Sequence, residues 1–260
     1  MGKFKIYNED CITTMDRIAK KYGQKIDIIL TSPPYNTGRN HGKMENHERR
    51  YDIYLEQRNN DEYADWIVDI FNHYDSILKE NGCVLFNMSY GNENPSQLWT
   101  VIADVINKTN FMVADTIVWK KKSALPNNVS HNKLTRICEF VFVLCRKHEY
   151  KTFYMNKQVK SYSKTGQKYY ENIFNFIKAK NNDGSNPLNK ATYSSDLCKQ
   201  LLIMYAKPDS IIYDSFNGTG TTGVAAIELG HRYIGSELSK EQCRYSYERL
   251  CKVGEQQCIA

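Results

Sequence analysis

The sequence predicts an α/β domain built on a mostly parallel, mixed sheet with helices on both faces. Short apolar runs of β-prone residues alternate along the chain with segments of helical apolar spacing, a pattern typical of parallel sheets. The composition, 41% hydrophobic and 25% charged, is that of a globular protein. At 260 residues the chain is long enough to bury such a core, and neither a repeat nor a linker divides it.

The first half of the chain alternates between predicted strands and helices. Residues 25–30 (KIDIIL) indicate a short buried strand, and residues 61–79 carry apolar side chains at helical spacing. Asn81 and Gly82 are expected to end that helix, because glycine readily takes the left-handed conformation of a helix cap. The other elements predicted here are strands over 83–88, 112–119 and 139–145 and a helix over 98–108.

The second half continues the alternation. A helix is predicted over 195–205, with Ser194 or Ser195 as its N-cap. It is followed by a strand over 210–214, a helix over 223–229, a strand over 232–235 and a helix over 240–251. Two stretches without clear periodicity, about 36–60 and about 155–190, are expected to form long loops, which are usually functional or mobile in a compact domain.

Basic residues exceed acidic ones, and they are unevenly distributed. Lysine and arginine number 35 against 29 acidic residues, a formal net charge of +6. The stretch 119–136 holds basic residues and no acid, and lysines dominate the stretch 147–190. Two basic stretches in one domain favour a nucleic acid as partner.

Several classes of protein are excluded. No apolar run approaches the roughly 18 residues that a membrane span needs, and MGKFKIYNED turns acidic too early for a secretory signal. The eight cysteines form no CxxC pair and no zinc-finger spacing, so no metal site is expected. We interpret them as reduced core thiols of a cytoplasmic protein.

A glycine-rich turn, DSFNGTGTTG over 214–223, follows a predicted strand and opens a predicted helix. Such a turn lets the backbone approach a ligand closely, with amide N–H groups directed at it. It matches GxGxxG, and Glu237 stands at the end of the next strand, where a ribose-binding acid would lie. Asp214 at the strand tip suits a cationic group, such as the amino end of a methionine, better than a pyrophosphate.

A second motif, Thr31-Ser-Pro-Pro-Tyr-Asn36, follows the strand over 25–30. Two prolines cannot continue a sheet ladder, and they hold the backbone so that its carbonyls point in fixed directions. Its central tetrapeptide, Ser32-Pro-Pro-Tyr35, resembles the catalytic loop, Asp/Asn/Ser-Pro-Pro-Tyr/Phe, of DNA methyltransferases that act on exocyclic amines. Asp-x-Phe-x-Gly-x-Gly, from Asp214 to Gly220, resembles their S-adenosylmethionine loop. The catalytic loop comes first, which is the permuted order of the β group.

The resemblance implies a Rossmann-like S-adenosylmethionine-dependent methyltransferase fold, acting on double-stranded DNA. It implies a catalytic-loop half over 1–146, a small target-recognition insert over 147–189 and a cofactor-binding part over 190–260. The implied catalytic residues are Ser32, Pro33, Pro34 and Tyr35. The implied cofactor residues are Asp10, Cys11, Tyr193, Ser194, Ser195, Asp214, Phe216, Gly218, Gly220, Thr221 and Glu237. The candidate DNA-binding residues are Arg39, Arg49, Arg50, Lys120, Lys121, Lys122, Lys157, Lys160 and Lys164.

The implied chemistry fits these residue types. An exocyclic amine is a poor nucleophile because its lone pair is delocalised into the ring. Ser32 Oγ and the Pro33 carbonyl could accept its two N–H bonds and free that lone pair, while Tyr35 stacks on a base swung out of the duplex. Serine at the first position is commoner among enzymes that make N4-methylcytosine, so cytosine N4 is favoured and adenine N6 is the alternative.

Other interpretations stay open at this point. An RNA or protein-amide methyltransferase can carry a similar loop, a nicotinamide oxidoreductase would explain GxGxxG, and a non-enzymatic DNA-binding module would explain the basic stretches. Within the favoured class, a cognate restriction endonuclease is a candidate partner. The chain could act as a monomer or as a homodimer.

Overall fold

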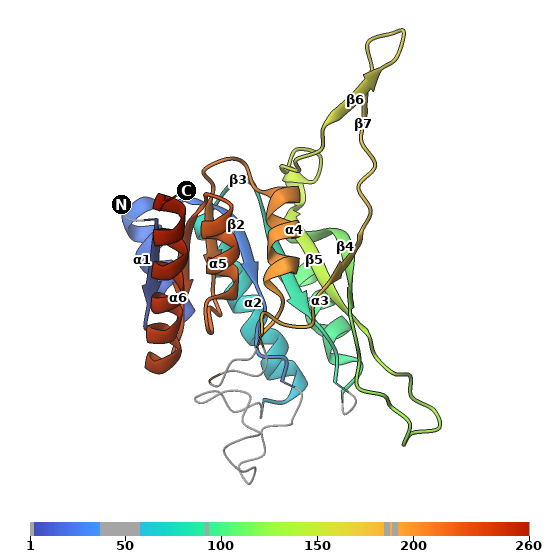
Figure 1. Cartoon of the computed structure of the whole chain (residues 1–260). Helices are drawn as coiled ribbons and strands as arrows, with labels where there is room; N and C mark the ends of the chain where they lie inside the picture. Colours follow the sequence, from blue (N-terminus) through green and yellow to red (C-terminus); the bar gives the residue numbers. More distant parts are fainter. Residues whose placement is uncertain (1–2, 37–57, 92–93, 185–187, 189–191, 260) are drawn as a thin grey trace.

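The computed structural model describes residues 3–36, 58–91, 94–184, 188 and 192–259. Its main sheet has eight strands in the order β1-β10-β9-β2-β3-β5-β4-β8 (Figure 1). Five of the seven neighbouring pairs are parallel, and β5 is the strand that runs against its neighbours, which confirms the predicted mixed sheet. The strands are β1 Phe4–Tyr7, β2 Ile26–Thr31, β3 Leu78–Met88, β4 Phe111–Lys121, β5 Cys138–Arg146, β8 Phe176–Ala179, β9 Ile211–Asp214 and β10 Arg232–Ser236.

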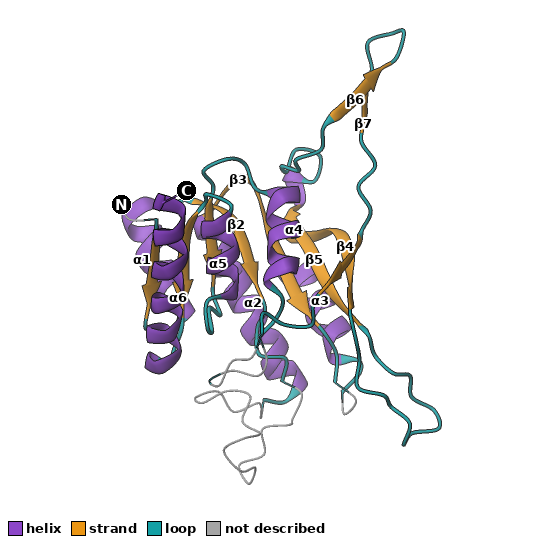
Figure 2. Cartoon of the chain, in the orientation of Figure 1, coloured by secondary structure: helices purple, strands orange, loops and turns teal. Residues whose placement is uncertain are grey.

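Helices cover both faces of the sheet (Figure 2). One face packs against α1 (Cys11–Tyr22), α2 (Asn60–Ile77) and α3 (Gln97–Lys108), and the other against α4 (Ser195–Tyr205), α5 (Thr221–Glu228) and α6 (Lys240–Ile259). Successive side chains of a strand point to opposite faces, so Ile29 belongs to the first core cluster and Leu30 to the second. A strand buried on both faces is mostly apolar, which explains the run Ile28–Leu30 in β2.

The end of α2 differs from the prediction. The helix ends at Ile77, and a Gly82 cap is wrong, because the left-handed residue is Asn81, with φ of 59°. The register of β3 against β2 moves from Ile26–Leu78 to Ile28–Cys83, so residues 79–82 loop out between these pairs. Gly82 is needed there for close approach, since a Cβ atom would lie 2.7 Å from the Asp27 carbonyl oxygen.

The segment 147–189 contains both a hairpin outside the main sheet and a strand within it. After the short helix η1 (Lys147–Glu149), the strands β6 (Val159–Tyr162) and β7 (Lys168–Tyr170) form a separate hairpin that projects from the body of the molecule (Figure 1). The chain then returns as β8, which joins the main sheet beside β4. Part of the predicted insert is therefore an edge strand of the main sheet.

Two further findings concern the described part of the chain. The seven cysteines placed there are all free thiols. Cys11, Cys83, Cys145 and Cys198 are buried, as predicted for core thiols, whereas Cys138, Cys243 and Cys251 are half-buried. Among the same residues, no helix is both long and apolar enough to cross a membrane.

The α1 helix was not predicted from the sequence. It begins after Asp10, whose carboxylate accepts a hydrogen bond from the Ile12 amide at 2.8 Å.

A buried carboxylate joins β2 to β9. Asp214 is 1% exposed. Its Oδ1 accepts the Thr31 hydroxyl at 2.6 Å and the Phe216 amide at 3.0 Å, and its Oδ2 accepts the Thr222 hydroxyl at 2.6 Å. Burial raises the pKa of Asp214 from 3.8 to about 6, although these donors lower it in part.

This pKa predicts a pH-dependent stability. Because the folded-state pKa is raised, the contribution of Asp214 to stability is present below pH 3.8 and is lost as the pH rises through about 6. Asp214→Asn removes this titration. Relative to wild type, the free energy of unfolding of the variant should therefore rise by about 2 kcal/mol between pH 4 and pH 6 and by about 3 kcal/mol over the full titration, at roughly 1.4 kcal/mol per pKa unit.

Denaturant unfolding at several pH values tests this. Asp209→Asn is the matched control, because the Asp209 side chain is 78% exposed. A difference between Asp214→Asn and wild type that stays constant with pH would contradict the prediction.

Candidate active site

The two sequence motifs meet at one edge of the sheet. Strands β2 and β9 are adjacent and parallel, and the chain leaves them in opposite directions, towards β3 and towards β10. In an open α/β sheet, the crevice outside the carboxyl ends of such a pair is the usual ligand site. A cavity of about 350 Å³ lies there, and both the Ser32–Tyr35 loop and the turn after β9 line it. This size is within the range of small-molecule sites.

One half of the cavity contains most of the predicted cofactor residues. The predicted residues that line it are Asp10, Cys11, Tyr193, Phe216, Gly218, Thr221 and Glu237. Four others are absent from the cavity lining. Asp214 lies behind it in the network described above, and Gly220 precedes α5 with φ of 85°. Ser194 and Ser195 begin α4, where Ser194 occupies the N-cap position but makes no capping hydrogen bond.

Glu237 fastens the glycine-rich turn to β10. Its Oε2 accepts the Gly218 amide at 2.7 Å, and its Oε1 accepts the Ser239 amide at 2.9 Å. A carboxylate has about four acceptor positions, so Glu237 can also accept hydroxyl groups of a ligand. The rings of Trp66 and Phe216 form an edge-to-face pair on the cavity wall, with centroids 5.5 Å apart.

This donor and acceptor set fits S-adenosylmethionine. Glu237 would accept hydrogen bonds from the ribose hydroxyls, and Asp10 would accept one from the adenine amine. The aromatic rings and the glycine backbone of the lining would pack against the rest of the ligand. Among the described residues that line the cavity, Asp10 and Glu237 are acidic, and two carboxylates are poor neighbours for the negative charges of a pyrophosphate. The donor set therefore favours an adenosine-type ligand over a dinucleotide.

A salt bridge that the sequence did not indicate closes the cofactor side. Asp183 accepts the Thr221 hydroxyl at 2.6 Å and Arg249 Nη2 at 2.7 Å, and Arg249 also donates to the Thr219 carbonyl. The Asp183 side chain is 4% exposed. It brings Asn181 and Asn182 to the cavity wall. No local pattern could have revealed this, because the partners lie 38 and 66 residues away.

The predicted catalytic residues, Ser32–Tyr35 on the proline loop, line the other half of the cavity. The Tyr63 hydroxyl donates to the Pro34 carbonyl at 2.7 Å. No hydrogen bond from the described residues reaches the Pro33 carbonyl, which lines the cavity together with Ser32. The Tyr35 hydroxyl lies 3.1 Å from Ser32 Oγ and 3.1 Å from Glu139 Oε2. Glu139 had no assigned role in the sequence, and the structure puts it in contact with this loop.

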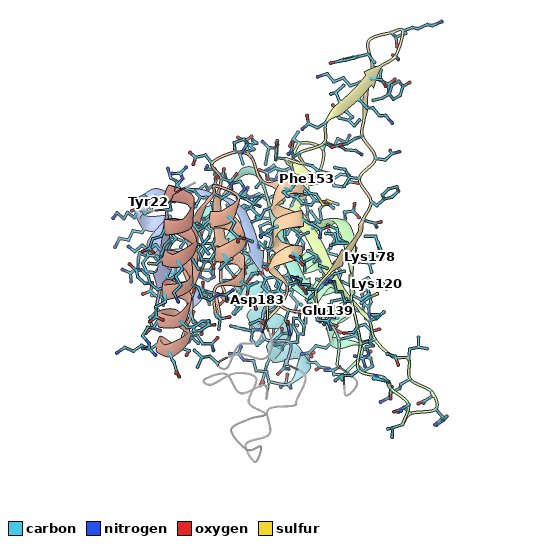
Figure 3. The ribbon with its side chains drawn as sticks, in the orientation of Figure 1. Tyr22, Lys120, Glu139, Phe153, Lys178 and Asp183 are labelled. Atoms are coloured by element: carbon cyan, nitrogen blue, oxygen red, sulfur yellow. The ribbon has the colours of Figure 1, made fainter. Side chains whose placement is uncertain are left out.

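The predicted DNA-binding lysines fall into two groups. The first group lies at the carboxyl end of β4, on the same edge of the sheet as the cavity: Lys120 and Lys121 end the strand, and Lys122 follows it. Lys121 forms an ion pair with Glu139. Figure 3 shows Lys120 beside Lys178, its register partner, and Glu139 and Asp183 towards the same end of the sheet. Lys157, Lys160 and Lys164 are exposed on the β6–β7 hairpin and its approach, which leave the opposite edge of the sheet. Arg39, Arg49 and Arg50 lie outside the described residues.

The comparisons with known proteins agree with this geometry. A family model described as DNA methylase matches residues 26–248. The type II methyltransferase M2.MboI of Moraxella bovis is 27% identical over 96% of this chain and 88% of its own length. The DNA adenine methyltransferase YhdJ of Escherichia coli is 22% identical over 94% of this chain and 82% of its own length.

Solved structures share the fold. The cytosine-N4-specific PvuII DNA methyltransferase superposes with a TM-score of 0.71 at 17% identity, covering 97% of this chain and 92% of that one. The M1.HpyAVI–SAM complex gives a TM-score of 0.61 at 24% identity, covering 95% and 99%. Since the family match spans most of the residues and both motifs, the chain belongs to the DNA methylase family, the S-adenosylmethionine-dependent enzymes that methylate exocyclic amino groups of DNA bases.

Proposed function

We propose that this protein transfers a methyl group from S-adenosylmethionine to cytosine N4 of a base flipped out of double-stranded DNA. The observation that carries the proposal is the meeting of the Ser32–Tyr35 loop and the glycine-rich turn in one cavity. Serine at the first catalytic position favours cytosine N4, and PvuII methyltransferase, with the same fold, is cytosine-N4-specific. Adenine N6 is the second candidate, because the relative YhdJ is an adenine enzyme.

The catalytic loop would prepare the amine. Ser32 Oγ and the Pro33 carbonyl would each accept one N–H bond of the amine, which favours a tetrahedral nitrogen with an available lone pair. Neither group needs to be a strong base, because the proton becomes acidic once the nitrogen is methylated. The ring of Tyr35 would stack on the flipped base, a contact worth roughly 1–3 kcal/mol.

The cofactor side would hold and align the donor. When bound, S-adenosylmethionine supplies a sulfonium methyl group as electrophile. Glu237, Asp10 and the Gly218 turn would hold its adenosine part in the same cavity as Ser32, where the donor and the target amine could meet. Asp214 would act on the cofactor through the turn, by holding the Phe216 amide.

One relative supports a proposal about the biological setting. M2.MboI is a type II methyltransferase. We infer a restriction-modification role, with an endonuclease that recognises the same DNA sequence as the cognate partner.

The first test is the product. Purified protein is incubated with unmethylated plasmid DNA and S-adenosylmethionine, and the digested nucleosides are analysed by mass spectrometry. We expect N4-methylcytosine, and Ser32→Ala should lower its yield by roughly 10- to 1000-fold, since an acceptor of the reacting amine is lost. N6-methyladenine would overturn the choice of base, and the absence of both products would overturn the proposed activity.

The two halves of the cavity should separate in binding and turnover. Glu237→Ala removes an acceptor of cofactor hydroxyls and of the Gly218 amide, so calorimetry should show S-adenosylmethionine affinity weakened by roughly 10- to 100-fold. Tyr35→Ala should lower kcat while cofactor affinity stays within about twofold. An equal loss of cofactor affinity in both variants would contradict these roles.

The edge of the sheet that carries the cavity should be the face that meets DNA. Replacing Lys120 and Lys122 with alanine should weaken DNA binding and reduce the slope of log Kd against log salt by roughly one per lysine. The matched double variant Lys160→Ala/Lys164→Ala, on the hairpin at the other edge, should change that slope little. Equal effects of both double variants in a fluorescence-anisotropy titration would contradict this orientation.

A further inference from the structure

We propose that Glu139 is a positioning residue that acts through the Tyr35 hydroxyl to make Ser32 Oγ an acceptor for the amine of the target base. This inference rests on the proposed function and deepens it. It starts from a difficulty in the catalytic loop. A serine hydroxyl can donate or accept, so a loop that must accept an N–H bond needs its serine proton turned away from the substrate.

The side chains around Ser32 form a continuous chain of hydrogen bonds. Ser32 Oγ lies 3.1 Å from Tyr35 Oη, and Tyr35 Oη lies 3.1 Å from Glu139 Oε2. Asn87 donates through Nδ2 to Tyr35 Oη at 2.9 Å and to Glu139 Oε2 at 3.1 Å. The other carboxylate oxygen of Glu139 forms an ion pair with Lys121.

The chemistry of these groups determines where each proton lies. An ionised carboxylate only accepts, so the single Tyr35 proton is donated to Glu139. The Tyr35 oxygen then has only acceptor positions left, and Asn87 Nδ2 occupies one of them. The 3.1 Å hydrogen bond between Ser32 and Tyr35 is therefore one in which the Ser32 hydroxyl donates to the Tyr35 oxygen. This leaves the lone pairs of Ser32 Oγ for the N–H bond of the substrate.

Asn87 supports this assignment. Its side chain is fully buried, and its Oδ1 has no hydrogen-bond partner among the described residues. If the amide were flipped, Asn87 Oδ1 would face Glu139 Oε2. Two acceptors would then lie against each other with no proton between them. The amide is therefore held with Nδ2 towards Glu139 and Tyr35, which requires the carboxylate to be an acceptor.

Lys121 completes the arrangement. The Glu139 side chain is 12% exposed, and a carboxylate that is largely removed from water needs a charged partner. Lys121 occupies Oε1 and leaves Oε2 to Tyr35 and Asn87. The carboxylate of Glu139 thus lies two hydrogen bonds away from Ser32 Oγ and supplies the negative charge that serine lacks.

The test uses two variants, each of which removes a different hydrogen bond of the series from Glu139 through Tyr35 to Ser32. Glu139→Gln keeps the size of the side chain and removes its charge, and Tyr35→Phe keeps the ring and removes the hydroxyl. With unmethylated plasmid DNA we expect each to lower kcat by about 10- to 100-fold, as for the loss of one charged hydrogen bond that acts in the transition state. The KM for DNA, the calorimetric affinity for S-adenosylmethionine and the melting temperature should stay close to wild type.

Because both residues act through the same series of hydrogen bonds, the kcat of the double variant should be about that of Tyr35→Phe alone. Glu228→Gln is the matched control, since Glu228 pairs with Lys199 outside the cavity, and it should leave kcat unchanged. Losses that multiply in the double variant, a Glu139→Gln effect confined to the KM for DNA, or a kcat within twofold of wild type would each overturn the inference. If the wild-type protein forms no methylated base, the proposed function itself fails. An active wild type with an unaffected Glu139→Gln variant overturns this inference alone.

Discussion

The site depends on the buried hydrogen bonds that join β2 to β9 through Asp214. Thr31 ends the strand before the catalytic loop, and Thr222 lies in the first turn of the helix after the glycine-rich turn. A carboxylate that is 1% exposed must find donors nearby, and it finds them in both motifs at once. Two loops that are more than 180 residues apart in sequence are thereby held against each other. A change at this junction would move both loops.

Acidic side chains fasten the loops of the cavity in the same manner elsewhere. Asp10 accepts the amide that starts α1, Glu237 accepts the Gly218 amide, and Asp183 accepts the Thr221 hydroxyl. Each bond fixes a segment that would otherwise have to be ordered when a ligand binds, and pre-ordered segments cost less on binding. These acids therefore have a structural task besides any contact with the ligand. The loss of one of them would affect the shape of the cavity as well as its chemistry.

The motifs and most strands could be predicted from the sequence because they depend on local rules. Prolines end β2, glycines allow the turn before α5, and apolar runs mark strands that are buried on both faces. The edge strands were missed, because β1 and β8 are short and only partly apolar and are defined by their neighbours in the sheet. Asp183 and Glu139 were missed as parts of the site for a related reason. Their partners are distant in sequence, and no periodicity encodes such a contact.

The basic stretches illustrate the same limit at a larger scale. In sequence, Lys120–Lys122 and Lys157–Lys164 look like parts of one nucleic-acid surface. Strand β5 runs antiparallel to its neighbours, so it carries the chain from the cavity edge to the opposite edge between these two groups. Charge composition indicates that cation-rich surfaces exist, but the direction of a single strand places Lys120–Lys122 on the side of the cavity and Lys157–Lys164 on the other side. Topology, rather than charge, therefore assigns the catalytic face.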